Sequence, residues 1–296
     1  MIAFITGGTG FIGSHLIGKL LSEGWDVHLL CRKETNFSLV NNSTSQPTIH
    51  ELTGKPEDLN RIVKKVKPDL VFHLASLSPS VHTLEDIPTL IESNITLGTQ
   101  LVEAMVQNEC YQLINTGTIL QHYEGMPYSP ASLYGATKQA FEAIIQYYIE
   151  TTPLKAIHLK LANVYGKNDP RPRIFSLLKK AALEQITLEM TPGEQYIDLI
   201  YIDDVVEAFY VAALRFEKRM DRKQEKFLIS SQTPIKLKEL VRIYEEVAGH
   251  KVSICWGGKP YRSREMMAYQ PYGIPLPQWK IKNSLYEGIK KTLSIE

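Results

Sequence analysis

The amino-acid sequence predicts an α/β fold in which a doubly wound parallel sheet carries a smaller C-terminal lobe. Apolar strand-like runs alternate with stretches of helical periodicity over about the first 165 residues, and these runs are nearly continuous in apolar residues. Such runs are typical of strands covered on both faces, and strand–helix alternation implies right-handed crossovers between parallel strands. Beyond residue 166 prolines cluster and the elements shorten, which indicates the lobe.

The expected elements follow this alternation along the chain. Strands are expected at residues 1–6, 26–31, 48–52, 69–75, 111–116 and 155–162, and helices at residues 12–22, 56–66, 85–107 and 132–148. A polar stretch at 33–46 is interpreted as a loop. Asp203 and Asp204 are interpreted as an N-cap and acidic first turn of a helix ending at Leu214, not as a metal pair. We place the sheet domain at 1–165 with a return at about 197–225, and the lobe at 166–196 and 226–296.

Composition excludes several classes of protein. The 33 Lys and Arg residues against 32 Asp and Glu residues leave a net charge of +1, too small to suggest nucleic acid as a partner. No apolar run has the ~20 residues that a membrane helix needs. The start MIAFITGG lacks a basic region and is interpreted as a core strand rather than a signal peptide. Three separate cysteines without metal or disulfide spacing favour the cytoplasm, and no metal site is expected: Cys31, Cys110 and Cys255.

A glycine-rich segment joins the first expected strand to the first helix. Gly7, Gly10 and Gly13 are spaced three apart, with Phe11 and Ile12 at the start of the helix. Missing side chains allow a tight turn and let backbone N–H groups approach a pyrophosphate at the helix N-terminus. In this strand–turn–helix context the motif predicts a dinucleotide-binding Rossmann domain. The alternative is a structural turn without a ligand.

The end of the second strand indicates which dinucleotide is bound. An acidic residue there would bond the ribose 2′-hydroxyl of NAD, but the sequence reads Leu30-Cys31-Arg32-Lys33. Arg32 can pair with a 2′-phosphate, so we expect NADPH to be preferred, with NAD as the other cofactor to consider. The alternative is that Arg32 and Lys33 form a solvated strand end. Glu51 is expected near the adenine or on the plain surface.

A tyrosine and a lysine share one face of the helix that begins near residue 132. Tyr134 and Lys138 are four residues apart, and a nearby ammonium and the helix N-terminus both favour the phenolate form. A phenol tuned in this way can donate or accept a proton near neutral pH. The strand ending in Thr116-Gly117-Thr118 places hydroxyls at the sheet edge where open α/β sheets bind ligands. The alternative is a chance surface Tyr/Lys pair.

Six segments carry a family resemblance, in order: TGGTGFIG (6–13), HLAS (73–76), ESNITLGTQ with Asn94, YGATK (134–138), LANVYG (161–166) and YIDDVVEAF (201–209). With them the chain resembles the extended short-chain dehydrogenase/reductases that act on nucleotide sugars. The resemblance implies that Thr116 bonds the sugar oxygen at C4 and Tyr134 is the acid/base. Lys138 would hold the nicotinamide ribose and lower the tyrosine pKa. It further implies a homodimer through helices 85–107 and 132–150, Asn94 bracing the active-site helix, and cofactor contacts from Leu74 and Ala75.

Three chemistries occur in this family. Dehydratases place an Asp-Glu pair after the catalytic threonine, where this chain has Gly117 and Thr118, so dehydration is disfavoured. A 4-epimerase holds NAD tightly and therefore favours an acidic residue after the second strand, and that residue is absent here. No cysteine lies between Asn115 and Lys138, which disfavours combined epimerisation and reduction. The leading hypothesis is an NADPH-dependent 4-reductase of an NDP-4-keto-6-deoxyhexose. Residues 114–138 resemble the reductases that make paratose- and abequose-type sugars, and an NADP-binding regulator is the non-enzyme alternative.

The later lobe is expected to bind the nucleotide sugar. Arg262 matches a family arginine that reaches the diphosphate, whereas Ile197 stands where the family often has another arginine. The resemblance implies that Asn163 touches the sugar or diphosphate, with a turn-stabilising asparagine as the alternative, and Thr118 is also expected to touch the substrate. Further candidates, each with a plain surface, loop or packing role as the alternative, are Arg264, Arg171, Arg173, Tyr196, His122 and Tyr123.

Overall fold

An eight-stranded parallel sheet forms the centre of the molecule. The structure is a computed structural model that describes residues 1–33, 35–40, 46–53, 55, 57–217, 220 and 222–294. The strand order is β14-β11-β6-β5-β4-β1-β2-β3, and every neighbouring pair is parallel. The fold prediction is therefore confirmed. The strands are β1 (Ile2–Thr6), β2 (Asp26–Arg32), β3 (Thr48–Leu52), β4 (Leu70–His73), β5 (Gln112–Thr118), β6 (Lys155–Leu161), β11 (Gln224–Ile229) and β14 (Ile274–Pro275).

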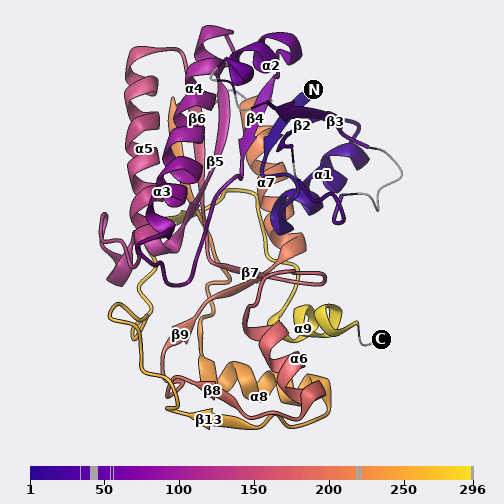
Figure 1. Cartoon of the computed structure of the whole chain (residues 1–296), viewed down its shortest axis with the longest axis vertical. Helices are drawn as coiled ribbons and strands as arrows, with labels where there is room; N and C mark the ends of the chain where they lie inside the picture. The colour runs from indigo at the N-terminus through magenta and orange to yellow at the C-terminus, as the bar shows by residue number, and fades with distance from the viewer. Residues whose placement is uncertain are drawn as a thin grey trace.

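Helices cover both faces of this sheet because its strands are apolar on both sides. Along β1, Ala3 and Ile5 belong to one buried cluster and Phe4 to the other, as alternation along a strand requires. The first cluster packs beneath α1 (Phe11–Ser22) and α7 (Ile202–Glu217), and the second beneath α2 (Asp58–Val66), α4 (Leu97–Gln107) and α5 (Leu133–Thr151). Figure 1 shows α4 and α5 on one side of the sheet and α1 and α7 on the other.

The helix expected at 85–107 is interrupted by a wider turn. It consists of α3 (Asp86–Ile91), a π-helical segment (Glu92–Thr96) and α4. Such single π turns often mark functional sites, and this one carries the buried Asn94. Other boundaries differ by a few residues: α7 continues to Glu217, and α2 begins at Asp58, while Pro56 lies outside the described residues.

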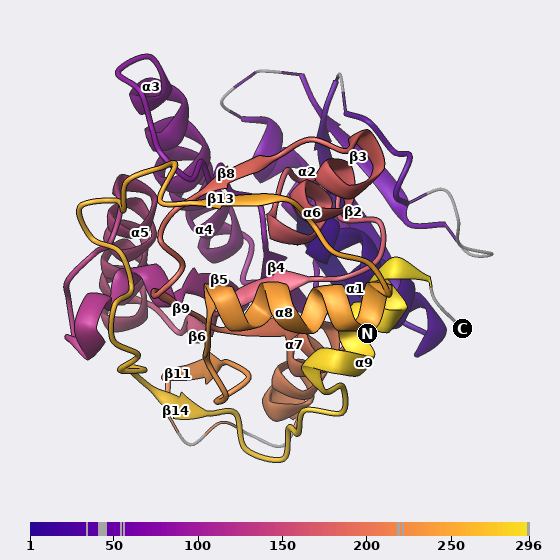
Figure 2. The same ribbon diagram turned by 90° about the horizontal axis from the view of Figure 1, so that it is seen from below.

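The lobe lies beyond the carboxyl ends of the strands (Figures 1 and 2). It contains three helices and three short strand pairs, β7 with β10, β8 with β13, and β9 with β12. The helices are α6 (Ile174–Glu184), α8 (Leu237–Ala248) and α9 (Leu285–Leu293). The short strands are β7 (Asn163–Tyr165), β8 (Leu188–Met190), β9 (Tyr196–Ile197), β10 (Leu199–Tyr201), β12 (Ile235–Lys236) and β13 (Ile254–Trp256).

The chain returns to the sheet over a longer stretch than the sequence predicted. We expected this return to end near residue 225, but β11 pairs with β6 as far as Ile229 opposite Leu161. The two-residue strand β14 then joins the sheet edge beside β11. Because β11 begins with charged residues, its sequence pattern did not indicate a strand, and the strand lies near the edge of the sheet. The interval 226–296 therefore contributes to both the sheet and the lobe.

Three further findings concern the described part of the chain. None of its helices is long and apolar enough to cross a membrane. Within the same residues, no cluster of three or more His, Cys, Asp or Glu side chains is placed to hold a metal ion. All three cysteines are free; Cys31 and Cys110 are buried and Cys255 is exposed.

Candidate active site

A cavity of about 820 Å³ lies between the carboxyl ends of the strands and the lobe. Its lining brings together residues that are far apart in sequence, from the glycine turn to the lobe. Arg32 and Ala75 lie outside this lining. The predicted site residues that line it are Gly7, Gly10, Phe11, Ile12, Gly13, Leu74, Thr116, Thr118, Tyr134, Lys138, Asn163 and Arg262.

The glycine turn forms a cradle with no room for side chains. Gly7 has a φ of +73°, and a Cβ added to it would lie 2.4 Å from the Ala75 nitrogen. A Cβ on Gly13 would lie 2.3 Å from the Gly7 carbonyl oxygen. Gly10 is the N-cap of α1 and supplies no side-chain cap, so the first N–H groups of this helix remain available to an anion. The turn therefore fits the pyrophosphate of a dinucleotide.

Thr116, Tyr134 and Lys138 all line this cavity. Thr116 is near the end of β5, and its hydroxyl is buried without a hydrogen-bond partner among the described residues. The Ser132 hydroxyl accepts a hydrogen bond from Gly135 N–H and so starts α5 just before Tyr134. The Lys138 ammonium, one turn further, is also buried and unpartnered within the described chain. Unused buried donors beside the glycine cradle fit a bound ribose and a sugar.

The electrostatics of Tyr134 differ from the sequence prediction. Burial raises the pKa of Tyr134, and this effect outweighs the lowering by the Ser76 hydroxyl and by the charges of Arg173 and Arg171. We expected Lys138 to lower this pKa, but burial instead lowers the pKa of Lys138 itself to about 8. In this structure desolvation disfavours both charged forms and so opposes the phenolate that the sequence predicts, and the acid/base role of Tyr134 stays a prediction.

Asn94 ties the active-site helix to the segment after β4. Its Oδ1 accepts hydrogen bonds from the Ser76 hydroxyl at 3.2 Å and from Leu77 N–H at 2.7 Å. Its Nδ2 donates to the Leu77 carbonyl and to the Thr137 hydroxyl. The Asn94 side chain is fully buried, and its bond to the Thr137 hydroxyl is buried as well. The contact with α5 agrees with the bracing role implied by the family resemblance.

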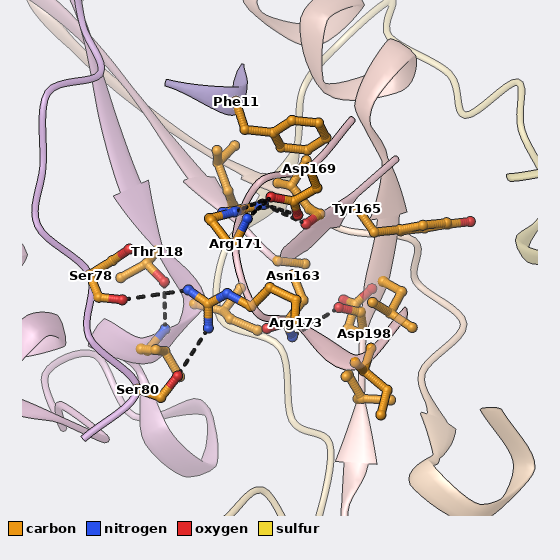
Figure 3. A pocket seen from close by; sticks show the side chains of 18 of the residues that line it. Phe11, Ser78, Ser80, Thr118, Asn163, Tyr165, Asp169, Arg171, Arg173 and Asp198 are labelled. Carbon is orange, nitrogen blue, oxygen red and sulfur yellow. Dashed lines mark hydrogen bonds and ion pairs between the residues drawn. The ribbon is translucent and has the colours of Figure 1, made fainter. Parts of the chain in front are cut away.

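Four arginines from the lobe side line the cavity (Figure 3 shows two of them). Arg171 pairs with Asp169 and its guanidinium lies 5.0 Å from the Phe11 ring centre. Arg173 reaches across to the segment after β4 and donates to the Ser80 hydroxyl and the Ser78 carbonyl. The others are Arg262, which makes a two-bonded ion pair with Glu265, and Arg264, which donates to Ser129 and lies over the Tyr123 ring.

The lobe also supplies residues that the sequence placed there. Asn163 is exposed on β7, and its side-chain amide donates to the Asp198 carbonyl. Tyr196 and Ile197 on β9 both line the cavity, so an apolar side chain occupies the position where the family often has arginine. Asp204 is buried and accepts hydrogen bonds from Lys282 and Asn283 backbone N–H groups. It therefore anchors the C-terminal segment.

No sequence pattern predicts the buried polar network that lies behind the cavity. His122 was expected as a pocket-lining or solvated loop residue, but it is 4% exposed and stacks on the Tyr272 ring at 4.3 Å. Gln121 is fully buried; its Oε1 accepts from Thr118 N–H and its Nε2 donates to Glu142. A Cβ on Gly117 would lie 2.8 Å from that Oε1 atom. The network thus fills the space beside the strand end.

The expected adenine-side residues lie on the surface. Arg32 is exposed at the end of β2, where its backbone N–H and carbonyl bond to the Thr35 hydroxyl. Glu51 is exposed on β3 and is the Cα partner of Cys31. Both positions border the carboxyl end of the sheet, as a site for the adenosine part of a dinucleotide requires.

A glycine cradle at a helix N-terminus, a threonine at a strand end and a Tyr/Lys pair on a helix, all lining one cavity, are typical of a dinucleotide-dependent α/β protein. The family model described as "NAD dependent epimerase/dehydratase family" matches residues 3–227, and the chain belongs to this family. The family prediction from the sequence is therefore confirmed.

Several relatives are similar over most of the chain. A CDP-abequose synthase of Yersinia pseudotuberculosis is 28% identical over 290 residues, covering 97% of this chain and 99% of the relative. A UDP-glucose 4-epimerase of Mycolicibacterium smegmatis is 29% identical over 226 residues, covering 71% and 72% of the two chains. The solved UDP-glucose 4-epimerase of Thermotoga maritima with UDP-glucose superposes with a TM-score of 0.84 at 25% identity. That superposition covers 99% of this chain and 98% of the other.

Proposed function

We propose that the chain is an NADPH-dependent 4-ketoreductase of an NDP-4-keto-6-deoxyhexose. The observation that carries the proposal is that the strand end Thr116-Gly117-Thr118 lines the same cavity as Tyr134 and Lys138. The hydroxyls and the ammonium suit reduction at a carbonyl, whereas the space beside Gly117 is filled by Gln121 and the side chain of Lys160. A carboxylate general acid or base, which dehydration needs, has no room at position 117.

Each residue of this site has a separate role in the proposed carbonyl reduction. When bound, NADPH supplies the hydride that adds to C4 of the sugar. The Thr116 hydroxyl donates a hydrogen bond to the C4 oxygen, and Tyr134 donates the proton that completes the alcohol. The raised pKa of Tyr134 keeps it in the protonated form that a proton donor needs. One hydride and one proton thus convert the ketone into an alcohol and leave oxidised cofactor.

Surface charge and similarity support the cofactor and substrate assignments. Arg32 is proposed to pair with the 2′-phosphate of NADPH, with NAD as the other candidate. Arg262 is proposed to reach the diphosphate and Thr118 and Asn163 the sugar. Similarity to CDP-abequose synthases over nearly the whole chain makes CDP-linked 4-keto sugars the first substrates to test.

A 4-epimerase is the second candidate because relatives named as UDP-glucose 4-epimerases match most of the chain. The test supplies NADPH or NADH with CDP-, dTDP-, UDP- and GDP-4-keto-6-deoxyhexoses and measures the product masses by mass spectrometry. A reductase oxidises one cofactor per product, and the product is heavier by two hydrogen atoms. An epimerase interconverts NDP-hexoses without net cofactor oxidation. Cofactor binding without turnover of any substrate would indicate the NADP-binding regulator instead.

We also propose a homodimer that pairs α4 and α5 with the same helices of a second copy. Tyr147, on the outer side of α5, is 62% exposed in the single chain and fits a contact surface. Sedimentation of the purified protein should give twice the chain mass, and Tyr147→Glu should shift it toward the monomer. A monomeric wild-type protein at assay concentration would reject this proposal.

A further inference from the structure

A row of polar residues crosses the sheet beneath α5, where apolar residues would be expected. Thr6, His73, Asn115, His158 and Lys226 are successive Cα partners on β1, β4, β5, β6 and β11. Partners in a parallel sheet point to the same face. The His73 ring packs edge-on against Phe141 of α5 at 5.1 Å, so this face is the one that α5 covers.

Most side chains of the row are buried. The series of hydrogen bonds along the row is interrupted between its second and third members. The Thr6 hydroxyl lies 2.8 Å from His73 Nδ1, and Asn115 Nδ2 lies 3.1 Å from His158 Nδ1. Between these two pairs, His73 Nε2 and Asn115 Oδ1 are buried without a partner in the described part of the chain. Lys138 Nζ, on the helix above, is the third such atom.

The neighbouring charges indicate what these atoms face. Burial is the main cause that lowers the pKa of His73 to about 3, and the charge of Lys138 is the second cause. His73 is therefore neutral. Burial also lowers the pKa of His158 to about 4, and the nearby Lys138 charge acts in the same direction. The His73 ring also packs on Phe141, which lies three residues beyond Lys138 and so on the same face of α5.

Glu142, one turn beyond Lys138, does not balance that charge. Its carboxylate lies 3.4 Å from the Lys160 ammonium and 2.6 Å from the Lys226 ammonium. These three groups, of which Lys226 belongs to the row, form their own ion-pair cluster. The acceptors of the row that lack a partner among the described residues are neutral: a ring nitrogen of His73 and the amide oxygen of Asn115.

We infer that His73 and Asn115 form an acceptor site that holds the Lys138 ammonium through one buried water. Three buried polar groups without partners are what a buried water binds. The site requires His73 to carry its proton on Nδ1 and donate it to Thr6, which leaves a lone pair on Nε2. The opposite tautomer would direct an N–H at a cation. His73 and Asn115 are thus positioning residues for Lys138.

The consequence for turnover rests on the proposed function, but the site itself does not. Long-range ¹H–¹⁵N spectra of histidine-labelled protein report the tautomer of His73 without any substrate, and His73→Phe assigns its signal. Lysine ¹⁵N spectra across a pH series report the Lys138 pKa. His158→Gln is the matched control, since His158 lies in the same row but both its ring nitrogens have partners.

We expect the Nδ1–H tautomer in the wild-type protein. We expect His73→Phe to lower the Lys138 pKa, because the ammonium loses an acceptor, and His158→Gln to leave it nearly unchanged. With a working substrate, the alkaline limb of the kcat profile should move to lower pH with KM unaltered. An Nε2–H tautomer, or an unchanged Lys138 pKa in His73→Phe, would overturn the inference. If no substrate is reduced, the proposed function fails and the spectra still decide the site.

Discussion

The side-chain amide of Asn94 donates a hydrogen bond of 3.0 Å to the hydroxyl of Thr137, which lies between Tyr134 and Lys138 on α5. Asn94 is presented by the π-helical segment and also bonds both the N–H and the carbonyl of Leu77. One buried side chain therefore fixes the helix that carries the proposed acid and the segment that follows β4.

Replacing Asn94 by Ala should destabilise the fold and slow turnover together. The change leaves several buried polar groups unpaired, at a cost of roughly 2–4 kcal/mol in the free energy of unfolding. Urea denaturation measures this cost, and the kcat of the soluble variant measures the effect on the site. Thr137→Val removes one of the bonds and should show a smaller loss. An unchanged denaturation midpoint in Asn94→Ala would contradict the bracing role.

Tyr134→Phe should separate catalysis from cofactor binding. Loss of the proton donor should lower kcat by about 10²–10⁴-fold, because positioned acid–base groups contribute on that scale. The NADPH dissociation constant, measured by fluorescence titration, should stay nearly unchanged. A Tyr134→Phe enzyme with wild-type kcat would remove Tyr134 from the mechanism.

Gly117 and Gln121 should show strong coupling. Gly117→Ala places a Cβ against the Gln121 side chain, which must give up its bonds to Thr118 and Glu142, so we expect a loss of about 2 kcal/mol. Gln121→Ala opens that space at the expense of the same bonds. The double variant should therefore lose less than the sum of the two single changes. Additive losses in urea denaturation would refute the steric argument.

Glu142 should make stability depend on acidic pH. Burial alone would raise its pKa, but the charges of His158, Lys160 and Lys226 outweigh burial and lower it to about 2. Because the folded pKa lies below the unfolded value of 4.5, this stabilisation is present above about pH 4.5 and is lost as pH falls toward 2.

Glu142→Gln tests that dependence. It should cost about 3 kcal/mol near neutral pH, since it leaves the buried Lys160 without its carboxylate. The steepness of stability against acidic pH should also decrease. Lys226→Ala, which removes the half-exposed partner, should cost less. Equal acid sensitivity of wild type and Glu142→Gln in thermal melts would count against the buried cluster.

Arg32 should select the phosphorylated cofactor. Arg32→Ala is expected to raise KM for NADPH about tenfold, the loss of one charged hydrogen bond, with little effect on NADH. Lys33→Ala, the neighbouring exposed cation, should have a smaller effect. Steady-state assays with both cofactors measure the cofactor preference. A wild-type preference for NADH would exclude the assignment of Arg32 to the 2′-phosphate.

Strong local patterns predicted the fold and much of the site. The glycine turn, the Tyr134 and Lys138 spacing and Thr116 at a strand end lie where the sequence placed them, in one cavity. Each depends on periodicity or on backbone geometry within a few residues. The sequence missed the extension of β11 to Ile229, because its first residues are polar, and it missed the buried positions of Gln121 and His122.

The sequence by itself determined the parallel α/β architecture, the cradle that only glycine fits and the residue types that face the cavity. Tertiary structure decided what surrounds them. It set the direction of the Tyr134 and Lys138 pKa shifts, which depends on desolvation by residues from many elements. It also aligned Thr6, His73 and Asn115 across three strands. Register between strands and depth of burial arise from contacts distant in sequence, and a local pattern carries no record of them.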